Sequence, residues 1–144
     1  MSFAESLYQL IVQTSTNLPS DVRRLLAGAM KQEDPSNRSA LALNTIALNV
    51  DMACDSERPI CQDTGTPIFQ VHYPLGWSTI QLKAQIRAAM AEATKRSYMR
   101  PNAVDAIYDK NTGNNLGGDD FPYIHFEETE SEDLTIELML KGGG

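Results

Sequence analysis

The sequence has few cysteines, and its basic residues are outnumbered by acidic ones. Only two cysteines, Cys54 and Cys61, occur among 144 residues, which is too few for the disulfide framework of a small secreted domain. Lys and Arg total 12 against 19 Asp and Glu, so the formal net charge is −7 at pH 7. A chain this short of cations is poorly suited to neutralise phosphates. We therefore expect a cytoplasmic protein without a nucleic-acid partner.

Long apolar runs and phosphate-binding loops are also missing. The apolar stretches are short and interrupted by charge, so we predict neither a membrane span nor a membrane partner. Residues 1–5 do not combine a basic start with an apolar core, so no signal peptide is predicted. Neither G-x-x-x-x-G-K-[ST] nor G-x-G-x-x-G occurs. With 42% hydrophobic residues, the chain has the composition of a soluble, acidic, globular domain.

The first part of the chain has helical spacing. Ser2 and Glu5 form a capping pair before a first amphipathic segment, and Pro19 marks the start of a second helix. A third helix, about residues 38–54, is apolar nearly all round, so we predict that it lies in the centre of the core. A fourth, long helix is predicted from a cap at Ser78 to about residue 97.

Three later segments have the character of strands. They cover residues 68–73, 123–128 and 134–140, and the last two flank an acidic stretch that suggests the tip of a hairpin. The predicted fold class is therefore α+β. We expect a helical N-terminal half to pack on a small, mainly antiparallel sheet, with one long intervening helix, and residues 1–144 to form a single domain.

The stretch from Arg58 to Pro67 loses all periodicity and is rich in reactive groups. Cys61, Gln62 and Asp63 supply a thiol, an amide and a carboxylate in three consecutive positions. Loops held between rigid elements commonly carry sites. The same composition also suits a capped turn, in which Asp63 satisfies local amides, Gly65 supplies a positive φ and Cys61 is buried and inert. Composition alone leaves both interpretations open.

Residues 59–66, Pro-Ile-Cys-Gln-Asp-Thr-Gly-Thr, resemble a known iron–sulfur motif. The motif is that of class I fumarate hydratases and of the related tartrate dehydratase α subunits. Three further segments are similar in the same order: residues 100–104, 111–115 and 141–144. The resemblance extends over essentially the whole chain, and four motifs in register make it specific.

The resemblance implies a hydro-lyase that interconverts fumarate and malate, a reaction of the tricarboxylic acid cycle. Family members hold an oxygen-sensitive [4Fe-4S] cluster through three cysteines and leave one iron open to the small dicarboxylate substrate. The resemblance makes Cys61 one cluster ligand. Gln62 and Asp63 become substrate-binding residues, and Asp63 also takes part in proton transfer. Arg100 pairs with a substrate carboxylate, and Gly144 offers its backbone amide to the substrate.

This chain also departs from the family pattern. The other two cluster cysteines of the family follow the glycine run that begins after Lys141. Cys54 lies seven residues before Cys61 on an apolar helix, where a core position is more common than a ligand. Asn114 stands where family members commonly have Asp. The resemblance therefore implies the N-terminal segment of a longer, homo-oligomeric enzyme, inactive alone, whose partner is the C-terminal remainder or a β subunit.

Two other functions stay open. The α component of a two-subunit tartrate dehydratase would use the same residues on a different substrate. A non-catalytic binding or assembly domain would expose an apolar sheet face and would self-associate when isolated.

The two histidines are candidate metal ligands. His72 and His125 lie on separate predicted strands and would share a pocket only if those strands pair.

Overall fold

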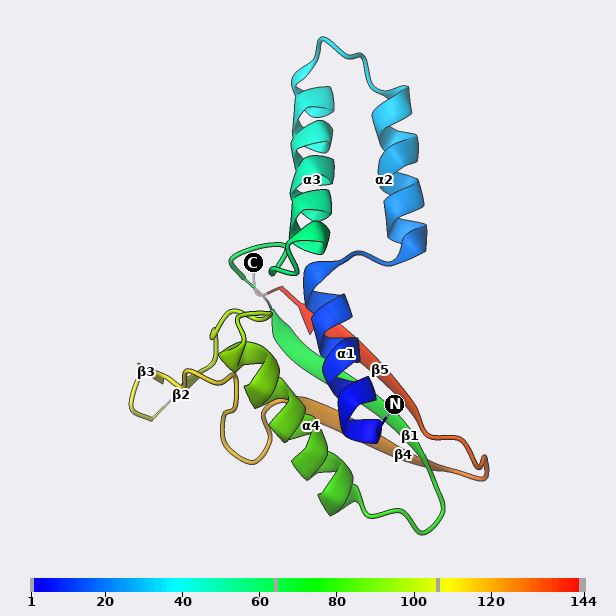
Figure 1. Cartoon of the computed structure of the whole chain (residues 1–144), viewed down its shortest axis with the longest axis vertical. Helices are drawn as coiled ribbons and strands as arrows, with labels where there is room; N and C mark the ends of the chain where they lie inside the picture. The colour runs from blue at the N-terminus through cyan, green and yellow to red at the C-terminus, as the bar shows by residue number, and fades with distance from the viewer. Residues whose placement is uncertain (1, 64, 106, 143–144) are drawn as a thin grey trace.

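The computed structural model describes residues 2–63, 65–105 and 107–142. In chain order the elements are α1 (Phe3–Thr16), α2 (Ser20–Gln32), α3 (Arg38–Asp55), β1 (Thr66–Pro74), α4 (Thr79–Lys95), β2 (Val104–Asp105), β3 (Lys110–Asn111), β4 (Tyr123–Thr129) and β5 (Thr135–Lys141). Figure 1 shows α1 and α4 lying over one face of the larger sheet, while α2 and α3 extend away from it. The α+β class is confirmed.

The helix starts follow from local hydrogen bonds, as their capping residues predict. The Ser2 hydroxyl accepts from the Glu5 N–H at 3.3 Å at α1, and the Ser78 hydroxyl accepts from the Gln81 N–H at 3.3 Å at α4. At α3 the side chain of Asn37 serves as the cap. These bonds satisfy backbone donors that have no partner within the helix.

The core lies between the two covering helices and the larger sheet. Its buried side chains include Leu7 and Ile11 of α1, Phe69 and Val71 of β1, and Leu82, Ile86 and Met90 of α4. Ile136 and Leu138 of β5 pack against this cluster from the sheet side. The alternation of β5 predicted from the sequence therefore does place its apolar residues on one packed face.

The predicted hairpin of the last two strands is wrong. The sheet order is β4-β1-β5, with β1 parallel to β4 and antiparallel to β5, so the sheet is mixed. The acidic stretch after Thr129 carries the chain across β1 rather than back along β4. The physical reason lies in β1: its Phe69 and Val71 are fully buried, and a strand with a neighbour on each side buries such side chains more completely than an edge strand.

The position predicted for α3 is also wrong. Leu41, Leu48 and Met52 are 69%, 64% and 68% exposed, and only Ala40, Val50 and Ala53 are buried. Figure 1 shows α3 beside α2, outside the layer formed by α1, α4 and the sheet. An apolar helix is buried only where another layer covers it, and the described residues cover α3 mainly with α2. Cys54, in its last turn, is half-buried rather than part of the core.

The two histidines lie on strands that pair, without forming a metal site. His72 on β1 is opposite Glu127 on β4, with 3.4 Å between its Nδ1 and a glutamate oxygen. His125 is opposite Gln70. No group of three His, Cys, Asp or Glu side chains suited to a metal ion occurs among the residues that the structure describes.

Candidate active site

The loop that carries Cys61 begins where α3 ends and is tethered before it reaches the thiol. Glu57, with φ +49°, turns the chain out of the helix. The Ile60 N–H donates to the Ser15 carbonyl of α1 at 3.1 Å. The Asn49 side-chain amide of α3 donates to the Ile60 carbonyl at 2.7 Å. The residue before Cys61 is therefore attached to two helices at once.

The cysteine is exposed, and two hydrogen bonds involve the residues next to it. Its Sγ donates to the Asp63 carbonyl at 2.7 Å, and the Asp63 carboxylate accepts from the Gly65 N–H at 2.9 Å. Gly65 has φ +87°. The expectations that Asp63 satisfies a local amide and that Gly65 supplies a positive φ are confirmed, whereas the buried thiol of the capped-turn interpretation is wrong. An accessible thiol can act as a metal ligand in its thiolate form.

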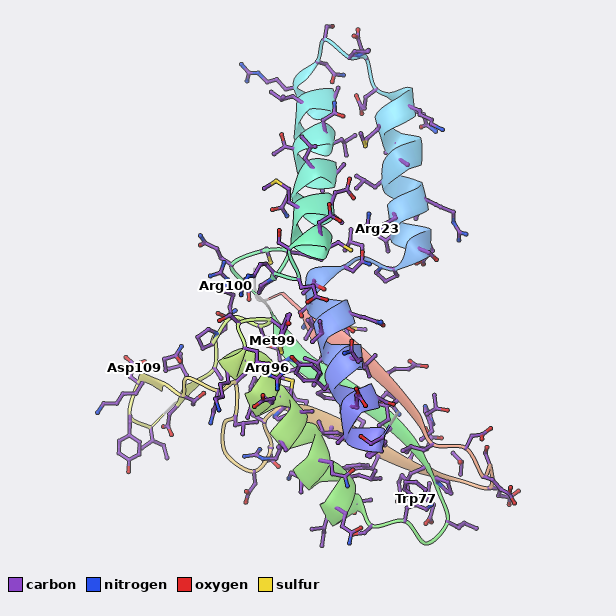
Figure 2. The ribbon with its side chains drawn as sticks, in the orientation of Figure 1. Arg23, Trp77, Arg96, Met99, Arg100 and Asp109 are labelled. Carbon is purple, nitrogen blue, oxygen red and sulfur yellow. The ribbon has the colours of Figure 1, made fainter. Side chains whose placement is uncertain are left out.

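The second motif segment, residues 100–104, lies against this loop. The Asn102 side-chain amide donates to the Gln62 carbonyl and to the Asp63 carboxylate, both at 3.4 Å. Arg100, two residues earlier, is exposed. Figure 2 shows it beside the loop that follows α3. Gln62, Asp63 and Arg100 are thereby brought to one region of the surface.

The third motif segment, residues 111–115, is bound to the second. The Asn115 side-chain oxygen accepts from the Asn102 N–H at 2.8 Å, and its amide donates to the Arg100 carbonyl at 2.6 Å. The Asn111 side chain donates to the Pro101 carbonyl. Asn114, where the family commonly has Asp, is exposed and caps the Leu116 N–H at 3.0 Å.

The fourth motif segment reaches the same place through strand pairing. Thr66, at the start of β1, is in register with Lys141, at the end of β5. A Cβ atom on Gly65 would lie 2.8 Å from the carbonyl carbon and oxygen of Lys141, so the two backbones touch. Gly144 lies outside the described residues. The described parts of the four segments that resemble family motifs are therefore linked to one another near the end of the sheet where β1 begins and β5 ends.

Sequence reasoning assigned no role to Asn102 or Asn115, although both lie inside motif segments. Asn115 is 4% exposed and has φ +56°. Asparagine is enriched in this left-handed region. The local sequence Gly-Asn-Asn is common in loops, however, so it does not distinguish Asn115 from other loop asparagines. Its partners lie 12 to 21 positions away and are visible only in the fold.

The donor set fits one ligand of an iron–sulfur cluster. Cys61 offers the soft thiolate that such clusters require, from an exposed turn. Within the described ranges no group of three or more His, Cys, Asp or Glu side chains could hold a metal ion, and Cys54 is half-buried on α3. Since a [4Fe-4S] cluster needs several thiolates, a cluster bound here would take its other ligands from outside the described residues.

A family model described as Fumarate hydratase (Fumerase) matches residues 4–144. The chain belongs to this family. A protein assigned as a class I fumarate hydratase in Geobacillus stearothermophilus is 47% identical over 140 residues, which is 97% of this chain and 27% of that protein. The L(+)-tartrate dehydratase subunit alpha of Escherichia coli K12 is 32% identical over 132 residues, or 90% of this chain and 43% of that protein.

The chain thus spans less than half the length of the relatives it matches. The family resemblance drawn from four short motifs is confirmed over nearly the whole chain. Among the described helices, none has the length and apolar character needed to cross a bilayer.

Proposed function

We propose that this chain is the N-terminal domain, residues 1–144, of a cytoplasmic [4Fe-4S] hydro-lyase that interconverts fumarate and malate by reversible hydration. The observation that carries the proposal is that the described parts of the four motif segments contact one another in series near one end of the sheet, and that the first of them carries an exposed thiol. The family and the class I relative support the reaction type. The chain alone is expected to be inactive.

Cys61 would hold one position of the cluster, and the two other thiolates would come from the rest of the enzyme. When bound, the cluster supplies an iron with an open coordination position, which acts as a Lewis acid. The bond from the Cys61 Sγ to the Asp63 carbonyl orients the sulfur before a cluster binds, and it would be replaced when the thiolate forms.

The neighbouring side chains would bind and orient the dicarboxylate. The exposed guanidinium of Arg100 is shaped for a bidentate pair with one carboxylate, and Gln62 can donate to another substrate oxygen. The Asp63 carboxylate is oriented by the Gly65 N–H and by Asn102, so it can take or give a proton in a defined direction. Gly144 would add its backbone N–H.

The partner of this domain would be the remainder of the enzyme, either a C-terminal continuation or a β subunit, within a homo-oligomer. This chain matches 27% of one relative and 43% of the other, and the unmatched part of each relative is long enough to correspond to such a partner. Cluster assembly and turnover therefore need the complete enzyme.

The test is a pair of cysteine variants in the complete enzyme, reconstituted anaerobically with iron and sulfide. Cys61→Ser is expected to abolish the visible absorbance of the cluster and the hydration of fumarate. The matched control Cys54→Ser changes the half-buried cysteine on α3 and is expected to keep both. A Cys61→Ser enzyme with a full cluster and normal turnover would reject the ligand assignment.

A second candidate reaction is the dehydration of tartrate. The similarity to L(+)-tartrate dehydratase subunit alpha over 90% of this chain favours it. The same residues would serve both reactions, so the substrate assay decides. Turnover of tartrate without turnover of fumarate or malate would choose this candidate and reject the first.

A further inference from the structure

We propose that Asn115 is a positioning residue for substrate binding: its buried side-chain amide fixes the backbone of residues 100–103 and so sets the directions of the Arg100 and Asn102 side chains. The inference rests on the proposed function in one respect, the assignment of Arg100 to a substrate carboxylate. Asn115 itself is buried, and its contacts to this segment are to the backbone of residues 100, 102 and 103.

The amide of Asn115 is saturated with hydrogen bonds. Its oxygen accepts from the backbone N–H groups of Asn102 at 2.8 Å and Ala103 at 3.2 Å. Its nitrogen donates to the Arg100 carbonyl at 2.6 Å and to the Thr94 hydroxyl at 3.1 Å. Two donors and two acceptor positions are all that a side-chain amide has. At 4% exposure the Asn115 side of each bond is buried, and the bond to Thr94 is buried at both ends, which limits competition by water.

The bonds join a rigid helix to a turn. Thr94 is buried near the end of α4, and its hydroxyl donates in turn to the Met90 carbonyl at 2.9 Å. Met90 belongs to the hydrophobic core. The Asn115 amide therefore attaches the backbone of residues 100–103 to α4 and, through Thr94, to a helix that packs in the hydrophobic core.

The loop around Asn115 reinforces the same turn. The Asn111 side chain donates to the Pro101 carbonyl, and the Thr112 N–H donates to the Ala103 carbonyl at 2.9 Å. Asn115 has φ +56°, a conformation that asparagine tolerates better than most residues. Together these contacts engage carbonyl or N–H groups of every residue from 100 to 103.

The turn at residues 100–103 is hydrogen-bonded to the Cys61 loop through the Asn102 side chain. Asn102 donates to the Gln62 carbonyl and the Asp63 carboxylate, both at 3.4 Å. The buried Asn115 amide is thus linked through Asn102 to Asp63 and directly to the Arg100 backbone, so it contributes to the relative positions of Arg100 and Asp63. Ground-state binding of a dicarboxylate depends on that spacing, so its loss should appear first in KM.

The test measures KM and kcat for fumarate and malate in the complete, anaerobically reconstituted enzyme. Asn115→Gly removes the side chain while keeping the left-handed backbone accessible. We expect KM to rise about tenfold, kcat to change less than about threefold, and cluster absorbance to stay unchanged. A KM within about twofold of the parent enzyme overturns the inference.

Two controls separate positioning from stability. Leu82→Ala, at the far end of α4 in the core, is expected to lower the melting temperature without raising KM. In an Arg100→Ala background, Asn115→Gly is expected to add little further to KM because it acts through Arg100; fully additive effects contradict the inference. If Arg100→Ala alone leaves KM unchanged, the carboxylate role in the proposed function fails instead.

A further variant covers a failure to fold. Should Asn115→Gly be insoluble, Thr94→Val tests the same link because it removes the hydroxyl that accepts from Asn115, together with the bond of that hydroxyl to the Met90 carbonyl within α4. We expect this variant to raise KM a few-fold with the cluster intact. An unchanged KM in Thr94→Val again overturns the inference.

Discussion

Gly65 is the residue at which the candidate site touches the end of the sheet. Its φ of +87° is left-handed, and a Cβ atom there would lie 2.8 Å from the backbone of Lys141. The positive φ is predictable from a glycine in a turn. The contact with Lys141 is not, because it depends on β5 pairing with β1. Substitutions can separate the energetic cost of the positive φ from that of the close approach to Lys141.

We predict that Gly65→Ala lowers the free energy of unfolding by about 2–4 kcal/mol, since it adds a backbone clash to a strained φ. Gly113→Ala is the matched control: Gly113 has φ +73° but nothing within 4 Å of an added Cβ. That variant should cost only about 1 kcal/mol. Urea denaturation of both proteins checks this, and equal losses would mean that the Lys141 contact contributes nothing.

Tyr8 of α1 provides a pH-dependent prediction. Burial raises the pKa of its phenol above the ordinary value, while the Arg96 guanidinium, 5.3 Å from the ring centre, opposes that rise. A raised pKa in the folded state means that the neutral phenol is favoured there. The contribution of Tyr8 to the free energy of unfolding is fully present below about pH 10, the pKa of the phenol in the unfolded chain. It is lost as the pH rises through the higher pKa of the folded protein.

Tyr8→Phe keeps the ring contacts and removes the titrating group. We expect this variant to lose less stability than the parent between pH 8 and alkaline pH above about 10, measured by denaturant unfolding. Tyr108→Phe alters an exposed tyrosine and should follow the parent at each pH. Parallel curves for the parent and Tyr8→Phe would contradict the role of Tyr8.

At the scale of elements, α2 and α3 form a pair that contributes little to the main core. α2 has no fully buried residue, and the longest side chains on the outer face of α3 are exposed. The ion pair between Arg23 and Asp51, at 2.8 Å, joins two partly exposed side chains and adds little stability. The pair therefore depends strongly on the intrinsic helix propensity of its residues.

We predict that Gly28→Ala stabilises this helix pair, because Gly28 lies inside α2 and an added methyl group would meet nothing within 4 Å. The expected gain is about 0.5–1 kcal/mol in the protection of α2 amides from hydrogen exchange. The reciprocal change Ala27→Gly, at the exposed neighbouring position, should reduce protection by a similar amount. Faster exchange in Gly28→Ala would show that propensity does not limit this pair.

At the scale of the whole molecule, one face of the larger sheet is covered by α1 and α4 and the opposite face carries an exposed apolar row. Ile68 of β1 is in register with Tyr123 of β4 and Met139 of β5, so the three side chains share that face. Tyr123 is 48% exposed and Met139 is 62% exposed. The next row on this face consists of Gln70, His125 and Glu137, so the apolar surface that the assembly hypothesis expects is limited to this one row.

We predict that the 144-residue chain by itself self-associates through this row, seen as a sedimentation coefficient that rises with protein concentration. The double variant Tyr123→Thr with Met139→Thr should shift the association to higher concentration. Leu25→Gln, on the exposed side of α2, is the control and should leave it unchanged. A parent chain that stays monomeric at all concentrations would count against the prediction.

Local features of the sequence determined the helix starts, the strand segments, the fold class and the family, because capping, periodicity and short motifs involve neighbouring residues. Only the tertiary structure decided three matters: β1 lies between β4 and β5, α3 lies outside the core, and Asn115 holds the Arg100 turn. Each depends on contacts between residues far apart in the chain. The free energy of such contacts comes from burial and from saturated hydrogen bonds, which exist only once the layers have assembled.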